Sequence, residues 1–121
     1  MNRSSLFSSQ KVIQNIIDGD NDGYVSDISL LNIDYVANKQ VVEIREFLQF
    51  ISDKFTILGA GNKVVNHAIL LSNGDFEDNV QYVLAKEAGC EVIITNDKLF
   101  IKEDIEVYTS DEFVENFLKK Q

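Results

Sequence analysis

The chain has 121 residues, of which 45% are hydrophobic, and its 11 basic and 20 acidic side chains give a formal net charge of −9 at pH 7. This length fits one domain with a real core, and this composition excludes a disordered chain. The charge excludes a basic surface that coats nucleic acid, because such binding depends on Lys and Arg at the phosphates. A polynucleotide held through bound cations, or a basic protein partner, is compatible with it.

The sequence also indicates where the protein works. It has no apolar run near the ~20 residues that a membrane span needs. Its first ten residues, MNRSSLFSSQ, lack the long apolar core of a secretory signal. A single cysteine, Cys90, cannot form an internal disulfide, which suits a reducing compartment. We therefore expect a cytoplasmic protein that does not enter a membrane.

The first half of the chain alternates helical and extended patterns. Apolar residues recur at helical spacing in three segments: 4–18, 27–39 and 40–54. Short runs rich in β-formers predict strands at 24–26 and 55–58. The GAGN sequence at 59–62 follows the second strand but lacks G-x-G-x-x-G, so it predicts a tight turn rather than a phosphate site.

The second half continues this alternation. Helical spacing covers 64–71 and 75–89, and Gly89 ends the second helix. The continuous apolar run at 90–95 predicts a strand buried in a parallel sheet. A further strand at 105–109 precedes an amphipathic helix whose first turn is expected to be capped around Ser110. Strands alternating with helices predict an α/β fold with a mainly parallel sheet, in a single domain over 1–121.

The stretch NGDFEDNVQY places several carboxylates at the start of a predicted helix. That helix is ~21 Å long, and the strand over 91–95 runs back over ~17 Å. Because the two lengths nearly match, Asp97, just past the strand, is expected to lie near Asp75 and Asp78. The carboxyl edge of an open α/β sheet is where ligands bind.

Two interpretations of these acids remain open. An aspartate at a helix start usually caps it, which contributes roughly 0.5–2 kcal/mol, and Asp75 occupies such a position. Asp78 lies past the capping position. Converging carboxylates repel one another and raise at least one pKa, and a hard divalent cation such as Mg²⁺ relieves that repulsion with oxygen ligands alone.

Other residues have simpler interpretations. One face of the helix over 75–89 is expected to meet the core through Phe76, Val80, Val83 and Leu84. The lone histidine, His67, is expected at the surface rather than in a metal site. Cys90 begins a buried strand and is expected to be a small core residue rather than a nucleophile.

Three blocks of the sequence resemble one known family. "NGDFEDNVQYVLAKEAGCEVIITND" is similar to N-D-F-E-D-A-L-Q-Y-x-A-A-x-E-x-G-x-D-x-I-I-T-R-N. "GYVSDISLLNIDYV" and "IEVYTSDEFVENF" resemble the same family's strand-then-helix segment and its ending. Over nearly its whole length the chain thus resembles the PIN-domain proteins, metal-dependent ribonucleases that include VapC-type toxins of toxin–antitoxin pairs.

This resemblance implies a fold and a site. The fold is a three-layer α/β domain with a short, mainly parallel sheet flanked by helices. The site is an acidic cluster that binds Mg²⁺ or Mn²⁺ and activates a water for attack on RNA phosphate. Carried over by position, Asp78 and Asp97 are the catalytic and metal-binding residues, and Thr95 matches the family's threonine. Asp75, as a further metal ligand, and Glu77 are candidate substitutes for the acids that the family has and this chain lacks. Asn32 falls where many members have a glutamate near the metal.

The sequence departs from the family at three points. The family opens with a central strand that bears a D-T-N motif, and no such strand is found here. Leu99 stands where the family has an aspartate, and Asn32 is neutral. The absent strand would lie between those near 24–26 and 91–95. Its absence leaves two unpaired edges unless these strands close up directly, or unless upstream sequence or another chain supplies a strand.

These observations leave more than one function open. The resemblance predicts a ribonuclease of the toxin class whose catalysis is impaired by the departures, with an RNA substrate and an antitoxin-like protein partner. The unpaired edges suggest a homodimer, in which a second chain would cover them. The alternative is a non-catalytic PIN-like domain that acts by binding another protein. An acidic response module is disfavoured, because the sequence has neither the aspartate that ends its first strand nor its late lysine.

Overall fold

The computed structural model describes residues 3–31, 44–72, 75–97, 99–100 and 103–118. In chain order its elements are α1 (Arg3–Ile17), β1 (Tyr24–Ser26), α3 (Ile44–Lys54), β2 (Thr56–Leu58), α4 (Asn62–Leu70), α5 (Phe76–Glu87), β3 (Val92–Ile94), β4 (Glu106–Tyr108), α6 (Ser110–Phe113) and the π-helical turn η1 (Val114–Leu118). Residues 27–31 are also helical. No described helix has the length and apolar character to cross a membrane.

The predicted strands are all present, each three residues long, and β1 occupies the predicted residues. The helices predicted over 27–39 and 40–54 extend into undescribed residues, so only their described parts, 27–31 and α3, are observed. The predicted end of α5 is confirmed, since Gly89 has a φ of 75°, a left-handed conformation that glycine adopts readily.

The cap of the last helix differs from the prediction. Thr109, not Ser110, is the N-cap of α6: its hydroxyl accepts a hydrogen bond from the Glu112 backbone N–H, while the Glu112 carboxylate accepts one from the Thr109 N–H. This reciprocal pair is a capping box. Ser110 is instead the first helical residue and is buried, and its hydroxyl donates to the Asn96 side chain.

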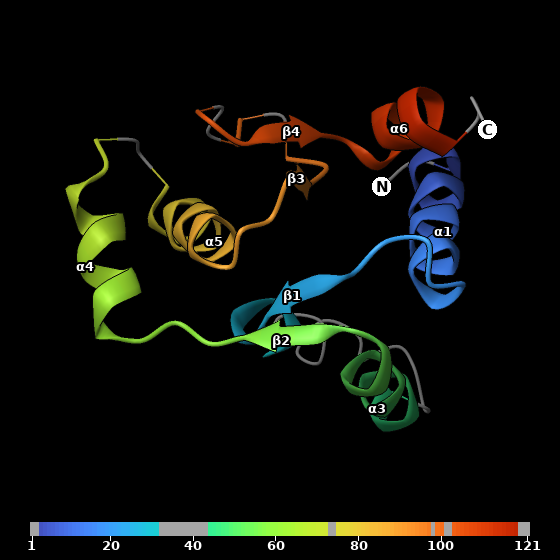
Figure 1. The fold of residues 1–121 in the computed structure, drawn as a ribbon, viewed down its shortest axis with the longest axis horizontal. Helices are drawn as coiled ribbons and strands as arrows, with labels where there is room; N and C mark the ends of the chain where they lie inside the picture. The colour runs from blue at the N-terminus through green and yellow to red at the C-terminus, as the bar shows by residue number, and fades with distance from the viewer. Residues whose placement is uncertain (1–2, 32–43, 73–74, 98, 101–102, 119–121) are drawn as a thin grey trace.

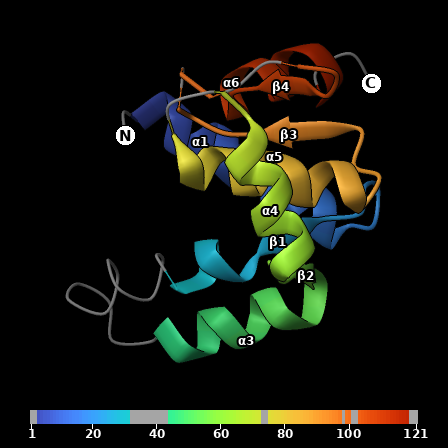
Figure 2. The ribbon, with the colours of Figure 1, turned by 90° about the vertical axis from the view of Figure 1, so that its left-hand side faces the viewer.

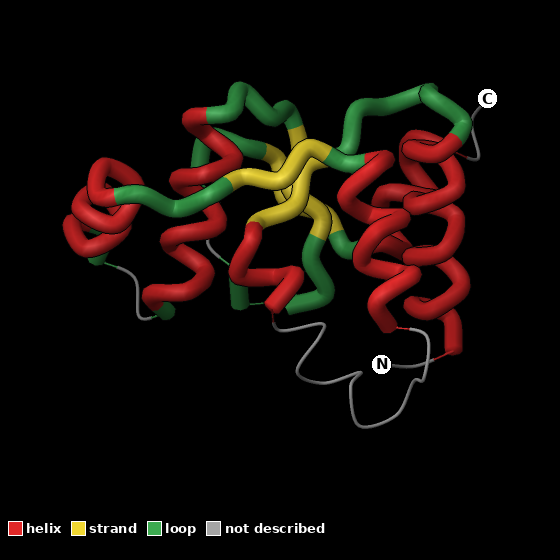
Figure 3. The backbone as a smooth tube through the Cα atoms, turned by 90° about the horizontal axis from the view of Figure 1, so that it is seen from below, coloured by secondary structure: helices red, strands yellow, loops and turns green. Residues whose placement is uncertain are grey.

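The strands form two separate parallel pairs. β1 pairs with β2, with Val25 opposite Ile57, and β3 pairs with β4, with Ile93 opposite Val107. The predicted parallel pairing is confirmed, but the sheet is divided, because among the described residues β1 and β3 do not pair. Figure 3 shows the strands gathered at the centre of the molecule, between the helices.

Helices cover the strands on both sides, as the three-layer expectation requires. Figure 1 shows α4 and α5 on one side and α1 with α6 on the other, and Figure 2 shows α4 across the face of α5. The first core cluster joins α4 and α5 to the strand residues Leu58, Ile93 and Val107. The second joins α1 and α6 to Val92 and Tyr108. Successive residues of β3 and β4 thus face opposite helical layers, which is the period of a strand.

One core prediction is wrong. Val80, Val83 and Leu84 are buried as expected, but Phe76 is 50% exposed. Phe76 is the first residue of α5. Helical spacing gives the direction in which a side chain points, and at the end of a helix no neighbour need lie in that direction.

Gly23 allows a close approach before β1. A Cβ built there would lie 2.7 Å from Phe55 Cδ2 and 2.8 Å from Ile16 Cγ2. We expect Gly23→Ala to lower the free energy of unfolding by about 1–3 kcal/mol, because both neighbours would have to move. The matched control is Gly59→Ala, whose added Cβ would meet only Asp27 Oδ2, at 3.4 Å. Urea denaturation of the two variants measures the difference, and equal stabilities would contradict the packing described.

Candidate metal site

Three aspartates meet where α5 begins and β3 ends. One carboxylate oxygen from each of Asp75, Asp78 and Asp97 lies within 4.8 Å of the other two. Asp78 is half-buried and the other two are exposed. The convergence expected from the lengths of α5 and β3 is thus present in the structure.

Asp75 is the N-cap of α5. Its Oδ1 accepts a hydrogen bond from the Asp78 backbone N–H, with 3.1 Å between the two atoms. The cap interpretation is therefore correct, and it does not exclude the other one. A carboxylate has two oxygens, and the single capping bond uses one lone pair of one of them.

Local turns fix the position of Asp97. Its side-chain oxygen accepts from the Leu99 N–H at 2.9 Å, and its own N–H donates to Thr95 Oγ1 at 3.1 Å. Its carbonyl also accepts from the N–H of Phe100, whose side chain is buried in the core. Thr95, singled out by the family pattern, thus supports the backbone of Asp97.

Carboxylate crowding changes the acidity of Asp78. Burial, a hydrogen bond to Asp97 and the negative charges of Asp75, Asp97 and Glu77 together raise its pKa from an ordinary 3.8 to about 6. Each cause disfavours the ionised form or favours the protonated one. In the absence of a cation, the folded protein therefore holds a proton on Asp78 at a pH where an isolated aspartate has lost it.

Other predicted residues do not join this group. Glu77 acts on Asp78 through its charge but is not one of the three convergent carboxylates. Asp27, which directly follows β1, lies beside Gly59 after β2 and is not in the acidic group found among the described residues. Asn32 lies outside the described residues.

Sequence reasoning missed the contacts that support this edge. The Asn96 side chain accepts hydrogen bonds from the backbone N–H and the hydroxyl of Ser110, which connects the end of β3 to α6. The buried Tyr82 donates its phenol hydrogen to Asp104, just before β4. An asparagine directly after a strand is a recognisable turn residue, but nothing in the sequence identifies its distant partner.

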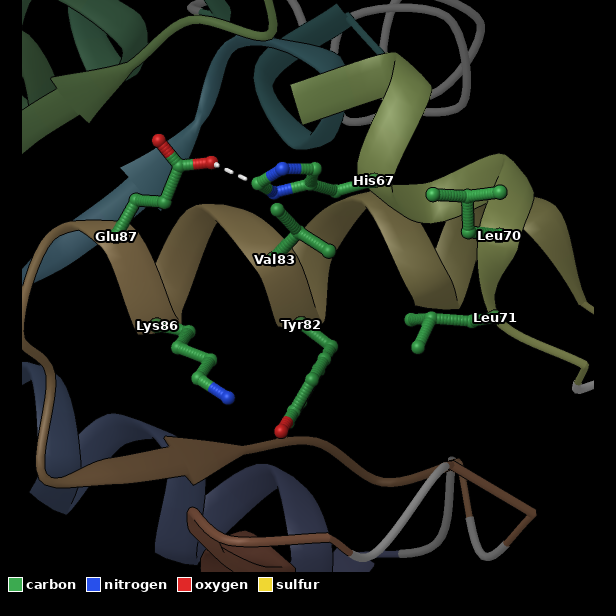
Figure 4. Close-up of a pocket in the computed structure, with 7 residues that line it drawn as sticks. All are labelled: His67, Leu70, Leu71, Tyr82, Val83, Lys86 and Glu87. Carbon is green, nitrogen blue, oxygen red and sulfur yellow. Dashed lines mark ion pairs between the residues drawn. The ribbon is translucent and has the colours of Figure 1, made fainter. Parts of the chain in front are cut away.

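A hollow of about 350 Å³ lies between α4 and α5 and contains none of the three aspartates. Figure 4 shows its lining residues, which are His67, Leu70, Leu71, Tyr82, Val83, Lys86 and Glu87. The charged residues that line the hollow form ion pairs. The Glu87 carboxylate lies 3.5 Å from Lys63 Nζ and 3.7 Å from His67 Nδ1, and Lys86 Nζ lies 2.8 Å from Asp104 Oδ2. The His67 side chain is 52% exposed, so His67 is a surface residue, as predicted.

Comparison with known proteins decides the family. The PIN domain family profile matches residues 1–99 of this chain, well over half of its length. The chain belongs to the PIN domain family. The resemblance found in the sequence is therefore confirmed, and the parallel strands between two helical layers are the α/β fold expected of a PIN domain.

One curated relative is close in sequence to this PIN domain. Over 84 residues the chain is 43% identical to Ribonuclease VapC1 of Aquifex aeolicus (strain VF5), a match that covers 65% of this chain and 51% of that protein. The chain thus spans about half the length of the relative. No solved structure matches the chain significantly.

The raised pKa of Asp78 predicts that the difference in stability between the parent protein and a variant without this carboxylate depends on pH. An aspartate that ionises near pH 3.8 in the unfolded chain and near 6 in the PIN domain costs stability as the pH rises through that interval, because the folded state holds more protons. We expect metal-free Asp78→Asn to gain stability over the parent on going from about pH 4 to about pH 7, by on the order of 1 kcal/mol after solvent screening is allowed for.

Urea denaturation at several pH values in the presence of a chelator measures this gain. Asp53→Asn, which changes an exposed aspartate near the end of α3, is the control for general charge effects. A gain that is the same at every pH, or equal in the two variants, would contradict the crowding of Asp78.

Proposed function

We propose that this PIN domain binds a divalent cation, Mg²⁺ or Mn²⁺, through Asp75, Asp78 and Asp97 and acts on RNA as an endoribonuclease of the toxin–antitoxin class. The observation that carries the proposal is the convergence of three carboxylate oxygens within 4.8 Å. The family membership and the 43% identity to a protein named as a ribonuclease support it.

The donor set fits a hard cation. All three side chains offer carboxylate oxygens, which Mg²⁺ and Mn²⁺ prefer, and no sulfur or imidazole joins them in the described residues. The raised pKa of Asp78 reports repulsion that is present without a cation. A positive ion placed among these oxygens would remove that repulsion and lower the same pKa, so folding in this region favours cation binding.

Each residue has a defined part in this proposal. A bound cation would lower the pKa of a coordinated water and stabilise negative charge at a phosphate. Asp78 and Asp97 are the catalytic carboxylates, and the turn around Thr95 holds Asp97 toward Asp78. Asp75 fixes the first turn of α5, which keeps Asp78 in place. The cation is also what allows RNA to approach a chain with a charge of −9.

Catalysis by residues 1–121 is expected to be impaired. The three acids come from one helix start and one strand end, so within the part of the chain that the structure describes the proposed site is acidic on one side only. Asn32, where many members have glutamate, supplies no charge, and Leu99 replaces a further acid. Phosphodiester hydrolysis needs tighter placement of the cation than a few ligands on one side provide.

The proposal extends to partners and location. The proposed substrate is RNA, and the proposed partner is an antitoxin-like protein. Because the chain has a net charge of −9, we expect this partner to be basic. A homodimer and a cytoplasmic location are further parts of it. The chain has a single cysteine, which is consistent with a reducing compartment. Cys90 is half-buried, and this burial raises the pKa of its thiol.

Cation binding tests the site without reference to activity. We expect Mn²⁺ to bind the parent protein in calorimetry, and Asp78→Asn or Asp97→Asn to bind it at least about tenfold more weakly, a loss of roughly 1.4 kcal/mol or more. Glu77→Gln is the matched control, since it removes one negative charge from the same helical turn but none of the convergent oxygens. Equal losses of Mn²⁺ affinity in all three variants would mean that the cation is held only by general electrostatic attraction.

RNA cleavage tests the chemistry. With Mg²⁺ present, we expect the parent to cleave single-stranded RNA slowly, Asp78→Asn to reduce the rate by about 100-fold or more, and Glu77→Gln to retain activity. Time courses on a labelled RNA measure these rates. Undiminished cleavage by Asp78→Asn would assign the activity to a contaminant or another site.

A second function is favoured by the lost acidic positions and the charge of −9. In it the PIN domain is non-catalytic and works by binding a basic protein. Calorimetry separates the two functions, because the absence of measurable Mn²⁺ binding would leave the acids to serve as helix caps and as contacts for a partner.

A further inference from the structure

The position of Asp97 decides whether the acidic group can act as one site. Asp75 and Asp78 belong to the same helix start, where a hydrogen bond from the Asp78 N–H to Asp75 already joins them. Asp97 comes from a different segment, the turn that follows β3. The ligands of one cation must be placed within about 0.5 Å of their working positions. Whatever holds this turn therefore sets the geometry of the acidic group.

Hydrogen bonds inside the turn give it its shape. The Asp97 N–H donates to Thr95 Oγ1 and the Leu99 N–H donates to the Asp97 carboxylate, so each bond joins residues that are two positions apart. Phe100 attaches the far end of the turn to the fold, because its side chain is buried in the first core cluster. None of these contacts attaches the near end, directly after β3, to another part of the chain.

Asn96 attaches that near end to the start of α6. A bond at the end of the strand pair runs from the Thr95 N–H to the Tyr108 carbonyl, at 2.9 Å. One residue further on, Asn96 Oδ1 accepts two hydrogen bonds from Ser110, one from the hydroxyl at 3.0 Å and one from the backbone N–H at 3.3 Å. An amide oxygen has two lone pairs and can accept both. The Asn96 side chain thus continues the pairing of β3 and β4 past the ends of the strands.

Ser110 is a firm anchor for this contact. It is 2% exposed, and α6, which it begins, lies against α1 (Figure 1). Because the Asn96 oxygen can only accept, the Ser110 hydroxyl donates to it, and the Ser9 hydroxyl, 3.0 Å away, must then donate to Ser110. The neighbouring Ser8 hydroxyl donates to Asp111. A buried hydroxyl without a partner is unfavourable, so the folded state favours these bonds together.

We propose that Asn96 is a positioning residue for the acidic group. Its bonds to Ser110 hold the turn after β3 against the layer of α1 and α6, which keeps Asp97 at the place where it meets Asp78. Because the two Ser110 hydrogens occupy the Asn96 oxygen, Asn96 acts through Asp97 and not as a ligand. The inference rests on the proposed function only in that the group so positioned is the proposed cation site.

The contact does not follow from the family pattern. That pattern has the arginine of T-R-N at the position of Asn96. A guanidinium has donors but no acceptor, so it could not accept a hydrogen bond from Ser110. The asparagine of this chain therefore introduces an attachment that the arginine of the pattern does not provide.

Backbone order parameters, measured by NMR on residues 1–121 without metal, test whether Asn96 holds the turn. We expect values of about 0.85 for the Asp97 and Leu99 amides of the parent, and a fall below about 0.6 in Asn96→Ala. The amides of Asp78 and of β4 should keep their values. Asn96→Asp keeps the accepting oxygen, so it should keep the turn as rigid as in the parent.

Mn²⁺ calorimetry tests whether the held turn matters to the cation site. We expect Asn96→Ala to bind Mn²⁺ about tenfold more weakly than the parent, as is usual when a residue that orients a metal ligand is lost. A residue that served only the stability of the fold would leave the Mn²⁺ affinity of the folded molecules unchanged. Asn116→Ala is the matched control, because the Asn116 side chain also donates a hydrogen bond, to the Glu112 carbonyl at 2.8 Å.

Other outcomes overturn the proposal. Unchanged order parameters at Asp97 and Leu99 in Asn96→Ala mean that Asn96 does not hold the turn, and equal loosening of β4 means a general loss of packing. A loosened turn with undiminished Mn²⁺ affinity means that the contact positions nothing that the cation needs. An equal loss of affinity in Asn116→Ala removes the link to Asp97. If the parent binds no Mn²⁺, the proposed function fails, and the order parameters alone decide whether Asn96 holds Asp97.

Discussion

The packing of α5 against both strand pairs is the interaction on which the rest of this PIN domain depends. Val80, Val83 and Leu84 are buried in one cluster with Ala68 of α4, and residues of β2, β3 and β4 pack on that cluster. Each fully buried aliphatic side chain contributes about 1.5–3 kcal/mol. Two-stranded sheets are marginal by themselves, and β1 and β3 share no ladder among the described residues. Among the described residues, packing on α5 rather than hydrogen bonding between β1 and β3 therefore holds the two strand pairs in place relative to each other.

The same helix explains why a cap and a candidate metal site coincide. Asp75 at the start of α5 gains a hydrogen bond and the favourable end of the helix dipole. The short return through Gly89 and β3 then brings Asp97 to that helix end, so that a second favourable turn adds a third carboxylate to a crowded place. Each acid is locally reasonable, and their sum is unfavourable, as the pKa of Asp78 shows. Charged residues that are each favourable in their own turn, but that repel one another once the helix and the strand come together, are characteristic of functional sites.

Most of the fold and part of the site could be predicted from local patterns. The strand at 24–26 is found at the predicted residues, because a β-rich run between a glycine turn and an acidic helix start leaves little freedom. The proximity of Asp78 and Asp97 followed from element lengths alone.

The cap at Thr109 was missed although T-x-x-E from Thr109 to Glu112 is a capping-box pattern in the sequence. The exposure of Phe76 could not be predicted, since periodicity gives a direction and not a neighbour. The contacts of Asn96 and Asp104 join distant segments, which no local pattern encodes.

The divided sheet and the acidic group meet at one physical point, the strand β3. Asp97 follows that strand directly, and its position relative to Asp78 is set by how firmly β3 is held. In the described residues β3 pairs only with β4, and Ile94, next to Thr95, is 38% exposed. A strand with one partner and exposed apolar residues opens more easily than a central one. A carboxylate on such a strand samples a wider range of positions, and cation ligands need placement within about 0.5 Å. The position of Asp97 relative to Asp78 therefore depends on how firmly β4 and the turn around Thr95 hold the end of β3.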